Sequence, residues 1–188
     1  MSIPPRRPTI TRGAAPPQKE EGNKINHRID APPARYALAP HFLLKGRISV
    51  RIGDKIDTGG FQWARRPDEE RLEIFTPFGG QIAELVKGGD GRVTLRRDRQ
   101  TVTAKSIGAL TASVLGVELD LDAIATWVQG EGGVEEGVSS ERRLANGEVW
   151  QVSAERFQYR DACRFASRLS AIRGDTVVRL VIDEWQAI

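Results

Sequence analysis

Few side chains in this sequence are of the types that perform catalysis or bind metal ions. The chain contains one cysteine, Cys163, and two histidines, His27 and His41. A nucleophilic site needs an activated serine or cysteine beside a base, and a zinc site built from thiolates needs several cysteines. Cys163 stands in a strand-like stretch where a small buried residue is expected, and His41 lies at the edge of the patterned part of the chain. We therefore expect neither a metal site nor a nucleophilic active site.

Adjacent acidic residues and paired glycines are the other patterns with chemical potential. In a pair such as Glu69-Glu70 the side chains point to opposite faces of a strand or lie in a loop, and ordinary solvated surface explains them. The glycine pairs lie in or beside predicted strands, and none precedes a helix as a phosphate-binding loop does. The sequence thus predicts no enzyme and no cofactor.

Large apolar side chains are more informative. The four tryptophans are spread over predicted strands and a predicted helix: Trp63, Trp127, Trp150 and Trp185. They fit ordinary core packing and equally an apolar ligand pocket, since both use aliphatic and aromatic side chains. Phe78 stands in a predicted turn, Thr76-Pro77-Phe78-Gly79-Gly80, where polar residues are usual. Either it folds back onto a sheet, or it projects toward a bilayer or a partner.

Alternation of apolar and polar residues identifies the strands that must position these side chains. Between residues 42 and 52 the even positions are apolar or glycine, whereas Lys45, Arg47, Ser49 and Arg51 face away. This pattern is typical of a strand with one solvated face. Short turns join the predicted strands, which indicates antiparallel neighbours because a parallel crossover needs about a dozen residues. The predicted strands cover residues 42–52, 57–65, 70–76, 81–87, 92–97, 101–104, 149–157, 165–172 and 176–185. The dipeptide Asn146-Gly147 predicts a two-residue hairpin before residue 149.

A helical period separates two blocks of strands. The apolar face of a first helix is followed by Gly116 as a predicted C-cap, and Asp120 is the predicted N-cap of a second helix that ends at Gly130. The residues at helical spacing are Ile107, Leu110, Thr111 and Val114, then Leu121, Ile124, Ala125 and Val128. About ten strands with one apolar face form a sheet that must curl and be covered. We expect a mainly β fold in which the helices plug the mouth of a curved sheet and leave a cavity.

The N-terminal segment differs in composition from the rest of the chain. Residues 1–40 contain eight of the ten prolines and seven Lys/Arg against three acidic residues, which leaves 21 basic and 22 acidic residues of the 28 and 25 in the whole chain. We expect residues 1–40 to form a flexible, Pro-rich, basic segment and residues 41–188 to form one domain. Because the domain is nearly neutral, the pI of 9.3 predicts no nucleic-acid binding.

A series of segments in unbroken order between about residues 40 and 187 carries a resemblance to a known family. They are Gly46-Arg47-Ile48-Ser49-Val50-Arg51, Phe61-Gln62-Trp63, Leu72-Glu73-Ile74-Phe75-Thr76-Pro77-Phe78-Gly79, Leu110, Leu115-Gly116, Trp127-Val128-Gln129-Gly130, Gly147-Glu148-Val149-Trp150-Gln151-Val152 and Val178-Arg179-Leu180-Val181-Ile182-Asp183-Glu184-Trp185. Together they resemble LolB, the family of outer-membrane lipoprotein receptors. Order and spacing make the resemblance specific, although no single segment would suffice.

The resemblance implies a fold and a function. It implies an unclosed antiparallel β-barrel of about 10–11 strands, with a lid of short helices over an apolar cavity. Such a protein accepts lipoproteins from the periplasmic carrier LolA by binding their acyl chains, and inserts them into the inner leaflet of the outer membrane, as a monomer without a cofactor. The cavity lining expected here is Ile48, Val50, Phe61, Trp63, Leu72, Ile74, Leu95, Trp127, Trp150, Val152, Leu180 and Ile182. The membrane-insertion loop expected here is Pro77, Phe78 and Gly79, with phenylalanine where the family more usually has leucine.

The resemblance also implies a location at the periplasmic face of the outer membrane and a lipid anchor. Family members carry a signal peptide and an acylated cysteine, but no apolar stretch follows Met1 and Cys163 cannot take the place of that cysteine. Two readings stay open: the natural chain begins further upstream, or this is an unanchored receptor. Two other functions stay open as well. One is a lipocalin-like binder of small apolar molecules without protein handover, and the other is a structural envelope module whose barrel is filled by its own side chains.

Overall fold

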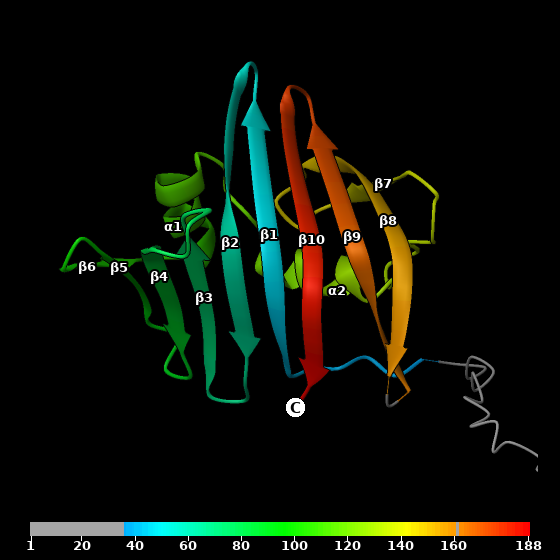
Figure 1. Cartoon of the computed structure of the whole chain (residues 1–188), viewed down its shortest axis with the longest axis horizontal. Helices are drawn as coiled ribbons and strands as arrows, with labels where there is room; N and C mark the ends of the chain where they lie inside the picture. The colour runs from blue at the N-terminus through cyan, green and yellow to red at the C-terminus, as the bar shows by residue number, and fades with distance from the viewer. Residues whose placement is uncertain (1–35, 161) are drawn as a thin grey trace, which may run out of the picture. The chain divides into compact units, whose positions relative to one another are not determined.

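The computed structural model describes residues 36–160 and 162–188 (Figure 1). Their strands form one unclosed antiparallel sheet of ten strands in the order β6-β5-β4-β3-β2-β1-β10-β9-β8-β7. The strands are β1 (Phe42–Ile52), β2 (Lys55–Arg65), β3 (Glu69–Phe75), β4 (Gln81–Gly88), β5 (Val93–Arg97), β6 (Gln100–Ala104), β7 (Ser140–Arg143), β8 (Val149–Arg160), β9 (Cys163–Arg173) and β10 (Thr176–Ala187). The predicted mainly β, meander-type fold is therefore confirmed.

The two halves of the meander meet in the middle of the sheet (Figure 1). β1 pairs with β2 on one side and with β10 on the other, in a register that places Ile48 opposite Gly59 and Leu180. β6 and β7 are the two edge strands. The sheet thus remains open, since no ladder joins its two edges in the described part of the chain.

Two short helices lie behind the sheet in Figure 1, on its apolar face: α1 (Ile107–Leu115) and α2 (Leu121–Val128). The predicted caps are confirmed, because Gly116 ends α1 with φ 75° and the Asp120 side chain accepts a hydrogen bond from the Ala123 backbone N–H at 2.9 Å. α2 ends slightly earlier than predicted, with Gln129 as its C-cap. Together with the connecting segment, α1 and α2 form what we call the lid, residues 107–128.

Strand boundaries follow the predicted ones closely in the first half and less closely in the second. β1 has the predicted ends, whereas β8, β9 and β10 are each longer than expected. The hairpin at Asn146-Gly147 is present but is not a two-residue turn, because Leu144 N–H donates to Glu148 O at 2.8 Å and encloses three residues. Gly147 there has φ 89°, which glycine adopts without strain.

Two glycines allow strands to approach closely near the centre of the sheet. A Cβ atom on Gly46 would lie 1.9 Å from Val181 O in β10, and one on Gly59 would lie 2.3 Å from Phe75 O in β3. Gly46 also stands at the register shift between β1 and β10. The resembling segment 46–51 therefore begins with a residue that the backbone geometry requires.

One hydrophobic cluster lies between the sheet and the helices. Its aromatic centre joins Phe42 to Trp63, with ring centroids 4.9 Å apart in an edge-to-face arrangement, and Phe42 to Phe165 at 5.7 Å. Cys163 is buried at the start of β9, as expected. Of the predicted N-terminal segment 1–40, residues 1–35 lie outside the described residues. Ala39 belongs to the cluster and is buried.

Candidate functional site

The twelve residues predicted to line an apolar cavity all lie in the interior. Each is buried, the most exposed being Leu95 at 7%, and all belong to the single cluster that includes side chains of both helices. The sheet contributes its alternating residues from β1, β2, β3, β5, β8 and β10, and α2 contributes Trp127. The sequence therefore places these residues correctly on one face, although lipid binding by them remains a prediction.

The interior is nearly filled by these side chains. The hollow between α2 and the sheet has a volume of about 20 Å³, far below the roughly 300–1,000 Å³ that is usual for sites that hold small molecules. Residues of the lid segment, Leu119, Ile124 and Trp127, form one wall, and Trp150 and Leu180 form the other. The expected apolar interior is thus present, whereas the expected open cavity is closed in this structure.

A wider groove lies at the mouth of the half-barrel, next to the closed hollow. It has a volume of about 390 Å³ and shares Leu119, Asp120 and Leu144 with the hollow. Its rim includes Lys87 and Lys105. The groove reaches from β4 and β5 past the lid to the β7–β8 hairpin, so it leads from solvent to the apolar side of α2.

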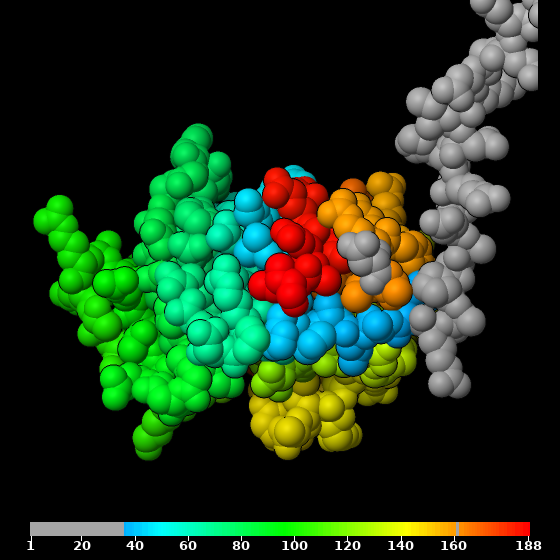
Figure 2. Space-filling view, turned by 90° about the horizontal axis from the view of Figure 1, so that it is seen from below, coloured from blue at the N-terminus to red at the C-terminus, as the bar shows by residue number. Residues whose placement is uncertain are grey.

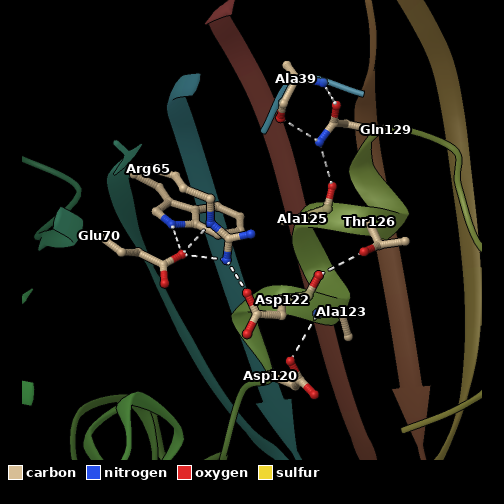
Figure 3. Close-up of polar contacts among 10 residues, drawn as sticks. Ala39, Arg65, Glu70, Asp120, Asp122, Ala123, Ala125, Thr126 and Gln129 are labelled. Carbon is tan, nitrogen blue, oxygen red and sulfur yellow. Dashed lines mark hydrogen bonds and ion pairs between the residues drawn. The ribbon is translucent and has the colours of Figure 1, made fainter. Parts of the chain in front are cut away.

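The N-terminal end of α2 is attached to the sheet through one arginine (Figure 3). Arg65 Nη2 lies 2.7 Å from Asp122 Oδ1 on α2 and 2.7 Å from Glu70 Oε1 on β3. Trp63 Nε1 donates to the same Glu70 oxygen at 3.0 Å. Glu70 is only 8% exposed, so the solvated surface expected for this acid is wrong. The two partners explain its burial, because a buried carboxylate requires paired charge and hydrogen bonds.

The C-terminal end of α2 is held by buried hydrogen bonds (Figure 3). The Gln129 side chain accepts from Ala39 N–H at 2.7 Å and donates to Ala39 O at 3.2 Å and to Ala125 O at 3.1 Å. From β9, Arg164 donates to Gln129 O at 3.0 Å and to Gly130 O at 2.8 Å. These contacts pair carbonyl groups at and just beyond the helix end, and Arg164 places a positive charge where the helix dipole favours one.

The two ends of α2 are therefore attached unequally. The Asp122 side chain is 78% exposed, and an ion pair to so exposed a group contributes little because water screens it. Gln129 is buried in contact with Ala39. The polar contacts at the N-terminal end of α2 therefore cost less to break than those at its C-terminal end, and opening there must also expose the buried Leu121 and Ile124.

The predicted membrane-insertion loop is a tight turn between β3 and β4. Gly79 N–H donates to Thr76 O at 2.9 Å, Thr76 N–H donates to Gly80 O at 2.7 Å, and Gly79 has φ 87°. Pro77 occupies the second position of this turn, where its fixed φ is favourable. Phe78 is 100% exposed. Phe78 therefore projects from the turn and does not fold back onto the sheet, while its contact with a bilayer or a partner stays a prediction.

Sequence reasoning missed three parts of the site. Val134 is fully buried although it stands in a stretch that reads as a polar loop, and the available signal was its apolar side chain, one of two valines in residues 131–140. The Gln129–Ala39 contact joins residues 90 positions apart, for which a single sequence carries no signal. Glu70 could have been suspected from its place on the apolar face of β3, in phase with Leu72 and Ile74.

Residues 36–160 and 162–188 contain no group of three or more His, Cys, Asp or Glu side chains placed to hold a metal ion. Within the same residues no helix has the length and apolar character needed to cross a bilayer.

Comparison with known proteins gives consistent matches. The sequence model of one family, described as "Outer membrane lipoprotein LolB", matches residues 40–185. A relative from Azoarcus sp. strain BH72, named "Outer-membrane lipoprotein LolB", is 26% identical over 156 residues, which are 80% of this chain and 81% of the relative. A relative of the same name from Chromobacterium violaceum is 29% identical over 150 residues, covering 77% of this chain and 80% of the relative.

Among solved structures, a LolA superfamily protein from Nitrosomonas europaea aligns with a TM-score of 0.49 and 8% identity, over 81% of this chain and 88% of that one. At this level of similarity the structural match assigns neither a family nor a function to the chain. The assignment rests on the sequence matches.

Proposed function

Because the chain belongs to the LolB family of outer-membrane lipoproteins, we propose that it receives lipoproteins by binding their acyl chains and places them in the outer membrane. It then works at the periplasmic face of that membrane, as a monomer, and takes its cargo from a LolA-type carrier. The observation that carries the proposal is that two features occur in one protein. An apolar interior lies under a lid with an exposed ion pair to the sheet, and Phe78 is fully exposed.

The apolar interior supports acyl-chain binding. Each CH₂ group moved out of water contributes about 0.8 kcal/mol, so a chain gains affinity in proportion to the length that is buried. Transfer from a carrier needs only that this gain exceed the gain in the carrier's own cavity. No cofactor or nucleotide is needed for such an exchange.

The closed interior requires that α2 move before an acyl chain enters. The hollow of about 20 Å³ excludes a chain, while the mouth groove of about 390 Å³ reaches Leu119 and Asp120 at the start of α2. A chain arriving through the mouth groove displaces the N-terminal end of α2, whose one ion pair to β2 within the described residues is Arg65–Asp122. The incoming chain replaces the apolar contacts that the lid gives up.

Phe78 supports delivery to a membrane. A phenylalanine that moves from water into an apolar phase gains about 1.5–3 kcal/mol, and at this position nothing is lost because the side chain has no contacts to break. The turn is held by its own backbone hydrogen bonds, so it presents Phe78 without prior rearrangement.

A handover assay tests the proposal. The full chain is mixed with a complex of a LolA-type carrier and a lipoprotein, and the partner of the cargo is found by pull-down. We expect the cargo to move to this chain, and to move on to vesicles when they are added. Cargo that stays on the carrier while a fluorescent fatty acid still binds would show a general binder of apolar molecules instead. Absence of both transfers and of fatty-acid binding would show a structural module.

A further inference from the structure

A second groove lies on the other face of the sheet. Its volume is about 680 Å³, larger than the interior hollow or the mouth groove. Its floor is the solvent-facing side of β1, β2 and β10, and the turn after β3 forms one wall, with Thr76, Pro77 and Gly79 in the lining. Figure 2 shows the teal-green part of the chain that contains this turn standing out on the side away from the yellow-green lid.

The floor of this groove is apolar where one glycine, Gly60, and two apolar side chains, Phe75 and Val181, lie. Gly60 lies opposite Phe75 in the β2–β3 ladder, and its missing side chain leaves the Phe75 ring uncovered on that side. A Cβ atom on Gly60 would meet Phe75 Cβ at an ordinary 3.5 Å, so the backbone does not demand glycine here. Val181 on β10 adds a second apolar patch, separated from Gly60 by Arg47 of β1, which lies opposite both residues. The outer face of an antiparallel sheet is usually polar, which makes this patch unusual.

Two of the three basic side chains on the rim of the groove form ion pairs, and the third does not within the described residues. Arg47 donates to Asp183 at 2.9 Å, which raises the pKa of Arg47, and Lys45 lies 3.5 Å from Glu184. Arg179 lies beside Ser49 across β1 and β10, and no carboxylate within the described residues forms an ion pair with it. The groove therefore presents one unmatched positive charge next to an apolar floor.

We propose that this outer groove binds an anionic phospholipid of the membrane that Phe78 enters. The phosphate pairs with Arg179, and one acyl chain lies on Val181, crosses the methylene stem of Arg47 and reaches Gly60 and Phe75. This inference rests on the proposed function, because the turn that forms the wall also carries Phe78 and brings the groove to the bilayer surface. The volume falls within the range of roughly 300–1,000 Å³ that is usual for small-molecule sites. The outer groove is separate from the interior that holds cargo, so resident lipid and cargo do not compete.

Photo-crosslinking of the full chain on vesicles tests the inference. The vesicles contain phosphatidylcholine and phosphatidylglycerol, the latter with a photoactivatable group in its acyl chain, and the modified residues are mapped by mass spectrometry. We expect modification of groove residues on β1, β2 and β10. Gly60→Leu fills the floor and should abolish it. Arg179→Gln should weaken the preference for phosphatidylglycerol at least about tenfold, as expected for the loss of one hydrogen bond to a charged group.

Arg51→Gln is the matched control, since Arg51 also faces outward on β1 but does not line the groove. It should leave the preference unchanged. An equal loss in Arg51→Gln would show general attraction to a charged surface and overturn the inference. Modification that is confined to the Phe78 turn, or that persists in Gly60→Leu, would also overturn it while leaving membrane contact intact. Failure of the wild type to bind vesicles at all would overturn both the inference and the membrane step of the proposed function.

Discussion

Arg65 Nη2 and Asp122 Oδ1 are 2.7 Å apart, and this contact joins β2 of the sheet to α2 of the lid. The same Arg65 nitrogen lies 2.7 Å from Glu70 Oε1. The one guanidinium group of Arg65 therefore forms two ion pairs that contribute very different free energies to stability. It neutralises a buried carboxylate, and it holds the end of a helix through an exposed one.

Asp122→Asn should ease lid opening with little loss of stability. Because the Asp122 side chain is 78% exposed, we expect the free energy of unfolding to fall by less than about 1 kcal/mol, and fatty-acid uptake to become up to about fivefold faster. Trp127 and Trp150 line the hollow, so stopped-flow quenching by a brominated fatty acid reports uptake. Asp57→Asn, which removes the surface pair with Lys55, should leave uptake unchanged. An unaltered rate in Asp122→Asn would contradict this role of the pair.

Arg65→Gln should destabilise the fold strongly. It leaves the buried Glu70 carboxylate with Trp63 as its remaining side-chain donor, and breaking a buried pair in this way costs about 3–5 kcal/mol. Urea denaturation measures the change. The double variant Arg65→Gln/Glu70→Gln removes the stranded charge and should recover much of the loss. If the double variant is no more stable than Arg65→Gln alone, the burial of Glu70 is not the cause.

Phe78→Glu should impair membrane delivery and spare acyl-chain binding. Losing about 1.5–3 kcal/mol of apolar transfer corresponds to at least about a tenfold drop in vesicle affinity, measured by co-flotation. Thermal stability should stay the same, because the Phe78 side chain is 100% exposed. Ile56→Glu changes another exposed apolar residue, in β2, and is the control. Equal losses in both variants would mean that added negative charge, not the turn, weakens binding.

Gly46→Ala should destabilise the protein while Gly60→Ala should not. The added Cβ would fall 1.9 Å from Val181 O at Gly46, but only at ordinary contact distances at Gly60. We expect a loss of at least about 2 kcal/mol for Gly46→Ala and a change within about 0.5 kcal/mol for Gly60→Ala, both by denaturant titration. Similar values for the two variants would show that β1 and β10 can separate without penalty.

The fold was predictable because its signals are local. Alternation in residues 42–52 fixes which side of β1 is buried, and Asp120 and Gly116 mark helix ends through contacts with their near neighbours. The turn at Phe78 follows from Pro77 and Gly79 alone. Each of these features depends on residues within a few positions, which a single sequence contains in full.

The less predictable part of the site depends on distant contacts. How tightly the interior is filled depends on how Trp127 and Trp150, from separate elements, fit together, and no pattern in the sequence measures that fit. The attachment of Gln129 to Ala39 spans 90 residues. The outer groove arises because Gly60, Phe75 and Val181 come into one row only when four strands, β3, β2, β1 and β10, align. Periodicity assigns a residue to a face but does not say what it meets there.

The pairing of β1 with β10 at the centre of the sheet has a consequence for how the chain folds. Each half of the meander can form its hairpins early, since those contacts are local, but the central ladder that aligns Ile48 with Leu180 must wait for the last strand. We expect slow folding with the closure of this pair as the late step. Until β10 arrives, β1 and β9 remain as unpaired edges that can template aggregation.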